Sequence, residues 1–70
     1  MKYVYVIEKA NDGSFSAYVP DLPGCTTCGD SIDEVKANIK DAVALYVDSL
    51  RDSKEPIPQP TSITDFVDAA

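Results

Sequence analysis

Two cysteines three positions apart are the clearest candidates for chemistry in this chain. Cys25 and Cys28 have the C-x-x-C spacing of zinc knuckles and of thiol–disulfide redox motifs. A zinc knuckle needs two more ligands, and the sequence has no third cysteine and no histidine. A redox pair needs its first thiol at a helix N-terminus, whereas these cysteines precede the predicted helix. In an extended segment their side chains point to opposite faces. We expect reduced structural thiols, with a conditional disulfide or a metal shared within an oligomer as alternatives.

Acid–base catalysis has little support in the remaining residues. The missing histidine removes the commonest general base and metal ligand. The carboxylates of Asp30, Asp33 and Glu34 are explained by their place at a predicted helix N-terminus. Asp12 and Asp21 lie in a turn and a loop, where aspartate is favoured in any case. We therefore expect no enzyme activity, no catalytic residue, no metal site and no cofactor.

Length and charge restrict the class of protein. The chain has 70 residues and a formal net charge of −6. The length fits one small domain with a thin core, which association with another chain would stabilise. We expect a domain over residues 1–60 and a short tail over 61–70. The acidic balance argues against nucleic-acid binding and favours a basic partner. No stretch resembles a signal peptide or a membrane span, so we expect a cytoplasmic protein without membrane contact.

The N-terminal half predicts a β-hairpin and a short third strand. Residues 2–9 and 14–20 are rich in β-branched and aromatic types, and residues 10–13 have turn composition. Two prolines and a glycine exclude regular structure in residues 20–24, and residues 25–29 complete the sheet.

A long helix follows the sheet. Ser31 and Glu34 form a capping box, and apolar residues then recur at helical spacing as far as Leu50. The helix ends before Pro56, where alternating prolines require an extended chain. Residues 62–67 fit a short final helix, with a fourth strand as the competing interpretation. The predicted fold class is α+β, a small antiparallel three-stranded sheet in the order β-β-β-α with one long helix on one face.

The hairpin loop decides which face of the sheet is free. A four-residue loop over residues 10–13 places Lys9 opposite Ser14. A two-residue turn would keep the same faces, and an unbulged three-residue loop would not. One face then carries Val4, Val6, Phe15, Ala17 and Val19 and receives the helix. The other face carries Tyr3, Tyr5, Ile7 and Tyr18. One helix covers one face, so these four residues are the predicted partner interface. The alternatives are a solvated face or one covered by the C-terminal tail.

One stretch resembles a known family. AYVPDLPGCTTCGD over residues 17–30, the capped helix and the Pro-Ile-Pro-x-Pro segment after it together resemble the HicB antitoxins of bacteria. The resemblance implies a partial ribonuclease-H-like fold without catalytic activity. It also implies a partner, a HicA-type toxin, which is a small basic ribonuclease that the antitoxin blocks by covering its active site.

The chain also departs from the longer members of that family. Those members carry a C-terminal DNA-binding domain, and nothing after Pro60 is long or basic enough for one, so no direct DNA binding is expected. The resemblance therefore predicts a type II antitoxin, and the thin core and open sheet edges predict a homodimer or higher oligomer. The alternative is a solitary homo-oligomeric HicB-like protein that binds another protein or a small ligand.

Overall fold

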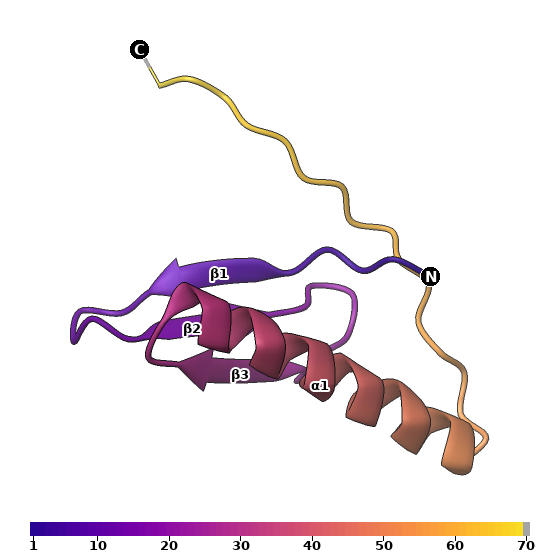
Figure 1. Cartoon of the computed structure of the whole chain (residues 1–70). Coiled ribbons are helices and arrows are strands. Elements are labelled where there is room, and N and C mark those ends of the chain that lie inside the picture. The colour runs from indigo at the N-terminus through magenta and orange to yellow at the C-terminus, as the bar shows by residue number, and fades with distance from the viewer. Residues whose placement is uncertain (70) are drawn as a thin grey trace.

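A computed structural model of the chain, describing residues 1–69, contains a three-stranded antiparallel sheet followed by one long helix (Figure 1). The β-β-β-α order and the α+β class predicted from the sequence are confirmed; a ribonuclease-H-like relationship stays a prediction. The strands are shorter than expected, because the chain before Val6 is extended but unpaired. In sheet order they are β1 (Val6–Lys9), β2 (Phe15–Tyr18) and β3 (Thr26–Gly29), and the helix is α1 (Ile32–Asp52).

The turn between β1 and β2 is built on residues 11–13. The amide of Ala10 donates to the carbonyl of Ser14 over 2.8 Å, which leaves three residues in the loop. Gly13 closes the loop with a φ of +89°, a left-handed conformation that glycine adopts without strain. Asp12 accepts hydrogen bonds from the Ser14 amide and hydroxyl, and these bonds, the hydroxyl first, hold the pKa of Asp12 below its ordinary value. A three-residue loop, rather than the predicted four, therefore sets the register of the hairpin.

The predicted N-cap of α1 is present. The Ser31 hydroxyl accepts from the amide of Glu34 over 3.1 Å, and the Glu34 carboxylate accepts from the amide of Asp30 over 3.1 Å. One amide that the helix leaves without a partner, and one amide just before the N-cap, are thereby satisfied.

The C-terminus of α1 uses a residue other than glycine. Lys54 has a φ of +56°, and its amide donates to the carbonyl of Arg51. The amide of Glu55 donates to the carbonyl of Leu50 over 2.9 Å, which completes a Schellman motif. Pro56 follows directly, so the helix ends where the sequence predicts.

The core lies between α1 and the β2–β3 half of the sheet. Gly29 allows this close packing, because a Cβ on it would lie 2.9 Å from the backbone nitrogen of Val35. Helix α1 is about 31 Å long, whereas a four-residue strand spans about 13 Å, so the C-terminal half of the helix extends past the sheet (Figure 1). The buried residues are Ala17, Val19, Leu22, Cys25, Val35 and Ile39.

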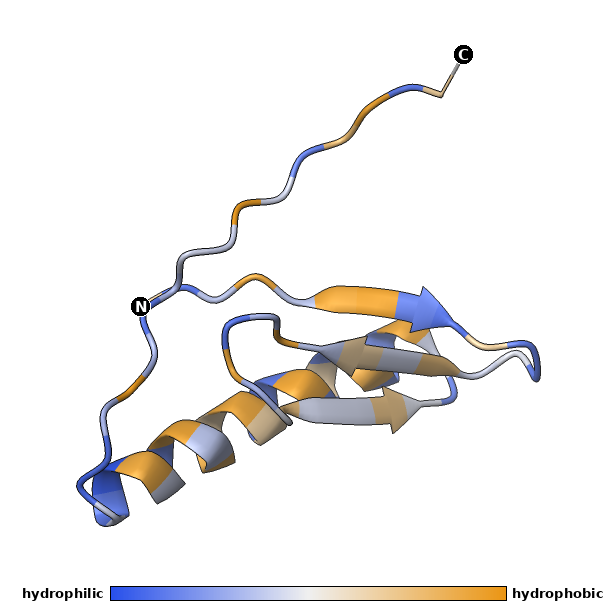
Figure 2. Cartoon of the chain, turned by 180° about the vertical axis from the view of Figure 1, so that it is seen from behind, coloured by the Kyte–Doolittle hydropathy of each residue, from blue (hydrophilic) through white to orange (hydrophobic). Residues whose placement is uncertain are grey.

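The C-terminal segment is neither a helix nor a strand. Residues 56–69 are extended, so both interpretations of residues 62–67 are wrong for the described part of the chain, and residue 70 of the predicted tail lies outside it. Two views half a turn apart show the segment passing the N-terminus and then leaving the body of the protein (Figures 1 and 2). No helix among the described residues is both long and apolar enough to cross a membrane.

Candidate partner-binding surface

The observed register reverses the predicted placement of β1. Val6 lies opposite Tyr18 and Ile7 lies opposite Ala17, a shift of one residue from the expected pairing. Because side chains alternate along a strand, this shift moves every β1 side chain to the other face. The prediction that Val6 faces the helix, and that Ile7 shares a bare face with Tyr18, is therefore wrong. The loop before Ser14 is one residue shorter than predicted, three residues rather than four, and this is the physical reason.

Three of the four predicted interface residues lie on the helix side. Tyr3, Tyr5 and Ile7 are partly buried and pack against the hydrophobic core. The Tyr3 hydroxyl donates to the carbonyl of Pro58 over 2.6 Å, which fastens the N-terminus to the segment after the helix. Their place on the helix side removes the argument that they form an uncovered face. Sequence reasoning assigned them to the wrong face because it depended on the loop length.

Tyr18 remains on the face that α1 does not cover. Its side chain is 38% exposed and lies between Val6 on β1 and Thr26 on β3. The next row across the sheet is Glu8, Ser16 and Cys28, and all three are exposed. We call this surface the outer face. It combines an aromatic ring and a half-buried valine with polar neighbours, which is typical of surfaces that bind proteins.

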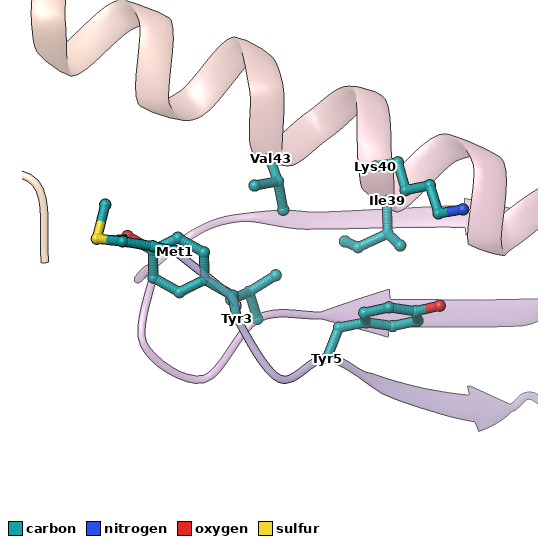
Figure 3. A pocket seen from close by; sticks show the side chains of 7 residues that line it. Met1, Tyr3, Tyr5, Ile39, Lys40 and Val43 are labelled. Carbon is teal, nitrogen blue, oxygen red and sulfur yellow. Dashed lines mark hydrogen bonds between the residues drawn. The ribbon is translucent and has the colours of Figure 1, made fainter. Parts of the chain in front are cut away.

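An open pocket lies on the helix side of the molecule, beside the extended chain that precedes β1. Its volume is about 210 Å³, and Figure 3 shows Ile39 and Val43 projecting from α1 toward Tyr3 and Tyr5. The pocket exists because α1 lies over β2 and β3 and leaves the β1 side less covered. Its lining residues are Met1, Tyr3, Tyr5, Val19, Ile39, Lys40 and Val43.

The loop at residues 20–24 joins three parts of the molecule. Leu22 at its centre is fully buried, and the carbonyl of Pro23 accepts from the Tyr46 hydroxyl of α1 over 2.9 Å. Backbone hydrogen bonds from Leu22 to Val19 and from Cys25 to Leu22 close the loop, and Gly24 completes it with a φ of +81°. Sequence reasoning missed Leu22, although a leucine between two prolines is a signal that an apolar residue needs a fixed position.

Asp21 in the same loop binds the C-terminal segment. Its carboxylate accepts hydrogen bonds from the amides of Thr61 and Ser62 at 3.1 and 3.0 Å and from both hydroxyls at 3.1 and 2.9 Å. These bonds, the Ser62 amide first and with burial acting against them, hold the pKa of Asp21 below its ordinary value. The role of Asp21 is structural, and no local sequence pattern marks its partner 40 residues away.

The cysteines lie on opposite faces of the sheet. Cys25 is buried beside Val19, and burial raises the pKa of its thiol, so the reactive thiolate is disfavoured. Cys28 is exposed on the outer face, and both are free. Within residues 1–69, no three histidine, cysteine, aspartate or glutamate side chains come together in a group that could hold a metal ion. Cys28 is therefore part of the outer face, and Cys25 is part of the core.

Comparison with known proteins gives a consistent result. A sequence model described as the HicB-like antitoxin of bacterial toxin–antitoxin systems matches residues 3–70. The UPF0150 protein Ta0767 of Thermoplasma acidophilum is 44% identical over 59 residues, which cover 84% of this chain and 86% of that protein. An uncharacterised 14.9 kDa protein of Haemophilus phage HP1 is 34% identical over 96% of this chain, which spans half of the phage protein's length.

A solved structure extends the comparison to the fold. A chain of a complex described as the HicA3 and HicB3 toxin–antitoxin complex superposes with a TM-score of 0.70 and 29% identity. The match covers 87% of this chain and 70% of the other. The capped helix and the Pro-Asp-Leu-Pro-Gly loop thus belong to a fold shared with a protein of a toxin–antitoxin complex. The chain belongs to the family of HicB-like antitoxins of bacterial toxin–antitoxin systems.

Proposed function

We propose that this protein is the antitoxin of a type II system and neutralises a HicA-type, mRNA-cleaving toxin by covering its active site. The observation that carries the proposal is the structural match to a chain of a HicA3–HicB3 complex. A toxin that cleaves mRNA acts where mRNA is translated, so the proposed location is the cytoplasm. The role is one of binding, with no reaction catalysed by the antitoxin itself.

The charge of the chain supports this kind of partner. A formal net charge of −6 on 70 residues creates a field that attracts a basic RNA-binding protein and accelerates its association. Such attraction is screened by salt, so binding should weaken as ionic strength rises.

The outer face is the surface we assign to the toxin. Tyr18 and Val6 provide apolar area that α1 leaves uncovered, and Glu8 beside them provides negative charge. This assignment replaces the four-residue interface expected from the sequence. Of those four residues, Tyr18 alone is retained. Tyr3, Tyr5 and Ile7 instead stabilise the fold from the helix side.

The test measures inhibition of RNA cleavage by a purified HicA-type toxin as the antitoxin is added. The unaltered chain should inhibit at a one-to-one ratio, and Tyr18→Ser should raise the required concentration about fivefold or more, as truncation of an interface aromatic does. Leu45→Ser is the matched control, because Leu45 is 71% exposed on α1 rather than on the outer face. A folded chain that fails to bind the toxin would disprove the proposal. Equal inhibition by Tyr18→Ser would remove the outer face from it.

The second candidate is a solitary homo-oligomeric protein that binds another protein or a small ligand. The pocket lined by Tyr5 and Val43 favours it, since it is open and mostly apolar. Absence of toxin inhibition together with stable self-association would support this candidate.

A further inference from the structure

The C-terminal segment presents apolar side chains to solvent. Ile63, Phe66 and Val67 are 92%, 98% and 93% exposed. Three large apolar residues within five positions are costly to leave in water and mark a binding segment. The segment over residues 63–69 has no backbone hydrogen bond to the rest of the described chain. It is therefore free to bind elsewhere.

The root of this segment is fixed, and its direction leads away from its own sheet. Asp21 holds Thr61 and Ser62 through four hydrogen bonds, and Tyr3 holds Pro58. Beyond Ser62 the segment projects outward in both views (Figures 1 and 2). Seven extended residues reach about 23 Å, which is enough to meet a neighbouring molecule. The anchor thus presents the segment to a partner rather than to the edge of its own β1.

A surface that fits this segment exists on the same protein. Strand β1 is an edge strand, with β2 as its one partner in the described sheet, so its outward backbone groups are available to another strand. The 210 Å³ pocket lies on the helix side beside Tyr3 and Tyr5, in the extended chain that leads into this edge (Figure 3). On the outer face, Val6 lies at the same edge and Tyr18 lies opposite it on β2, and the two side chains form an apolar surface there. A strand added at β1 and continued along the chain before it therefore meets apolar surface on both sides.

The alternation of side chains in the segment fits a site with apolar surface on both the helix side and the outer face. In an extended chain Phe66 and Asp68 point one way, and Ile63 and Val67 point the other way. Phe66 in the pocket would place Asp68 near Lys40 on the pocket rim, about two residues along the strand. Among residues 1–69, Lys40 has no carboxylate within ion-pair distance. Residues 55–69 carry three carboxylates and no basic side chain, so the charges are complementary.

We propose that residues 63–69 of one copy bind along β1 of a second copy, with Phe66 in the pocket and Asp68 beside Lys40. Each copy has one segment and one pocket, so reciprocal exchange closes a twofold dimer. The two contacts bury the exposed apolar side chains and cover the edge strand. The inference does not depend on a toxin, because every group in it belongs to this chain.

The first test is the concentration dependence of the mass of the full chain, measured by sedimentation across the micromolar range. The unaltered chain should be a dimer that dissociates on dilution. Phe66→Ser should raise the dissociation constant about tenfold or more, whereas Leu45→Ser, which changes another exposed apolar side chain, on α1, should leave it unchanged. A chain that is monomeric throughout, or a dimer that Phe66→Ser leaves unchanged, would overturn the proposal.

The second test distinguishes exchange between copies from a segment folded onto its own chain. Phe66→Ser damages the segment, and Lys40→Glu damages the pocket rim. A mixture of the two variants should associate more strongly than either alone, because the heterodimer retains one intact contact. No gain on mixing would overturn the proposal, and so would a thermal midpoint lowered by Phe66→Ser in a monomer. Combining Lys40→Glu with Asp68→Lys in one chain should restore association lost in the single variants.

Discussion

The loop at residues 20–24 and the segment at residues 63–69 are both irregular and both carry large apolar side chains, yet their burial is opposite. Leu22 in the loop is fully buried, whereas Phe66 in the segment is 98% exposed. Hydrogen bonds between the backbones of Val19, Leu22 and Cys25 close the loop around its leucine, and the segment has no such bonds. Irregular backbone can therefore complete a core when its polar groups are paired within it. The segment, whose backbone makes no hydrogen bond to the rest of the described chain, leaves its apolar side chains exposed.

The largest expected effect is the loss of stability on replacing Leu22, which tests whether the loop belongs to the core. Leu22→Ala removes a fully buried side chain and should lower the free energy of unfolding by about 2–5 kcal/mol. A domain of this length has about 4–10 kcal/mol in total, so the variant should be largely unfolded at moderate temperature. Urea denaturation followed by circular dichroism measures the change.

The matched control for Leu22 lies in the C-terminal segment. Ile63→Ala, measured at concentrations where the chain is monomeric, should change stability by about 0.5 kcal/mol or less, because Ile63 is 92% exposed. Similar losses in both variants would mean that the segment packs on its own domain in solution.

A second prediction concerns the junction between β3 and α1, on which the packing of the core depends. Gly29→Ala would put a Cβ 2.9 Å from the backbone nitrogen of Val35, which cannot move without shifting α1. Thermal and urea unfolding should show a loss of about 1–3 kcal/mol. Gly13→Asn is the control, because the space around Gly13 is open and asparagine tolerates a positive φ. An unchanged Gly29→Ala variant would show that the helix can lift off the sheet without cost.

Features encoded by neighbouring residues were predictable from the sequence. The capping box at Ser31 and the strand composition around Phe15 depend on a few adjacent positions, and both are confirmed. The register of β1 was not predictable, because one residue more or less in the loop before Ser14 exchanges the faces of Tyr5 and Val6. A sequence pattern gives the composition of a turn more reliably than its length.

Long-range contacts account for the rest of what the sequence did not reveal. Asp21 binds Thr61 and Ser62 across 40 residues, and no local pattern marks such a pair. The aromatic composition near the N-terminus pointed to an interface, but three of the four residues pack against the core. Tyr18 alone keeps the predicted position on the uncovered face.

A third prediction concerns the C-terminus of α1, where the helix ends and the extended segment begins. Lys54 has a φ of +56°, which costs a residue with a Cβ free energy that glycine does not lose. Lys54→Gly should therefore raise the free energy of unfolding by about 0.5–1 kcal/mol, as an increase in the urea midpoint. Ser53→Gly is the control and should lower stability, because Ser53 has an ordinary helical φ of −83°. A loss in both variants would mean that the lysine side chain contributes more than its backbone costs.

The smallest expected effect is acid release of the C-terminal segment from the loop. Hydrogen bonds from Ser62 and Thr61 lower the pKa of Asp21 below its ordinary value of 3.8, so the ionised carboxylate is the form that holds the segment. This stabilisation is complete above the unfolded value and is lost as the pH falls through the lower folded pKa. In a pH titration followed by NMR, the amide signals of Thr61 and Ser62 should shift toward unfolded positions in that acidic range, before those of Val35 and Ile39 in the core. Asp21→Asn, which removes the charge but keeps the shape, should weaken the anchor at neutral pH and abolish the pH dependence. If the two amides instead titrate together with the core, then the loop and the segment unfold as one unit and the contrast between them fails.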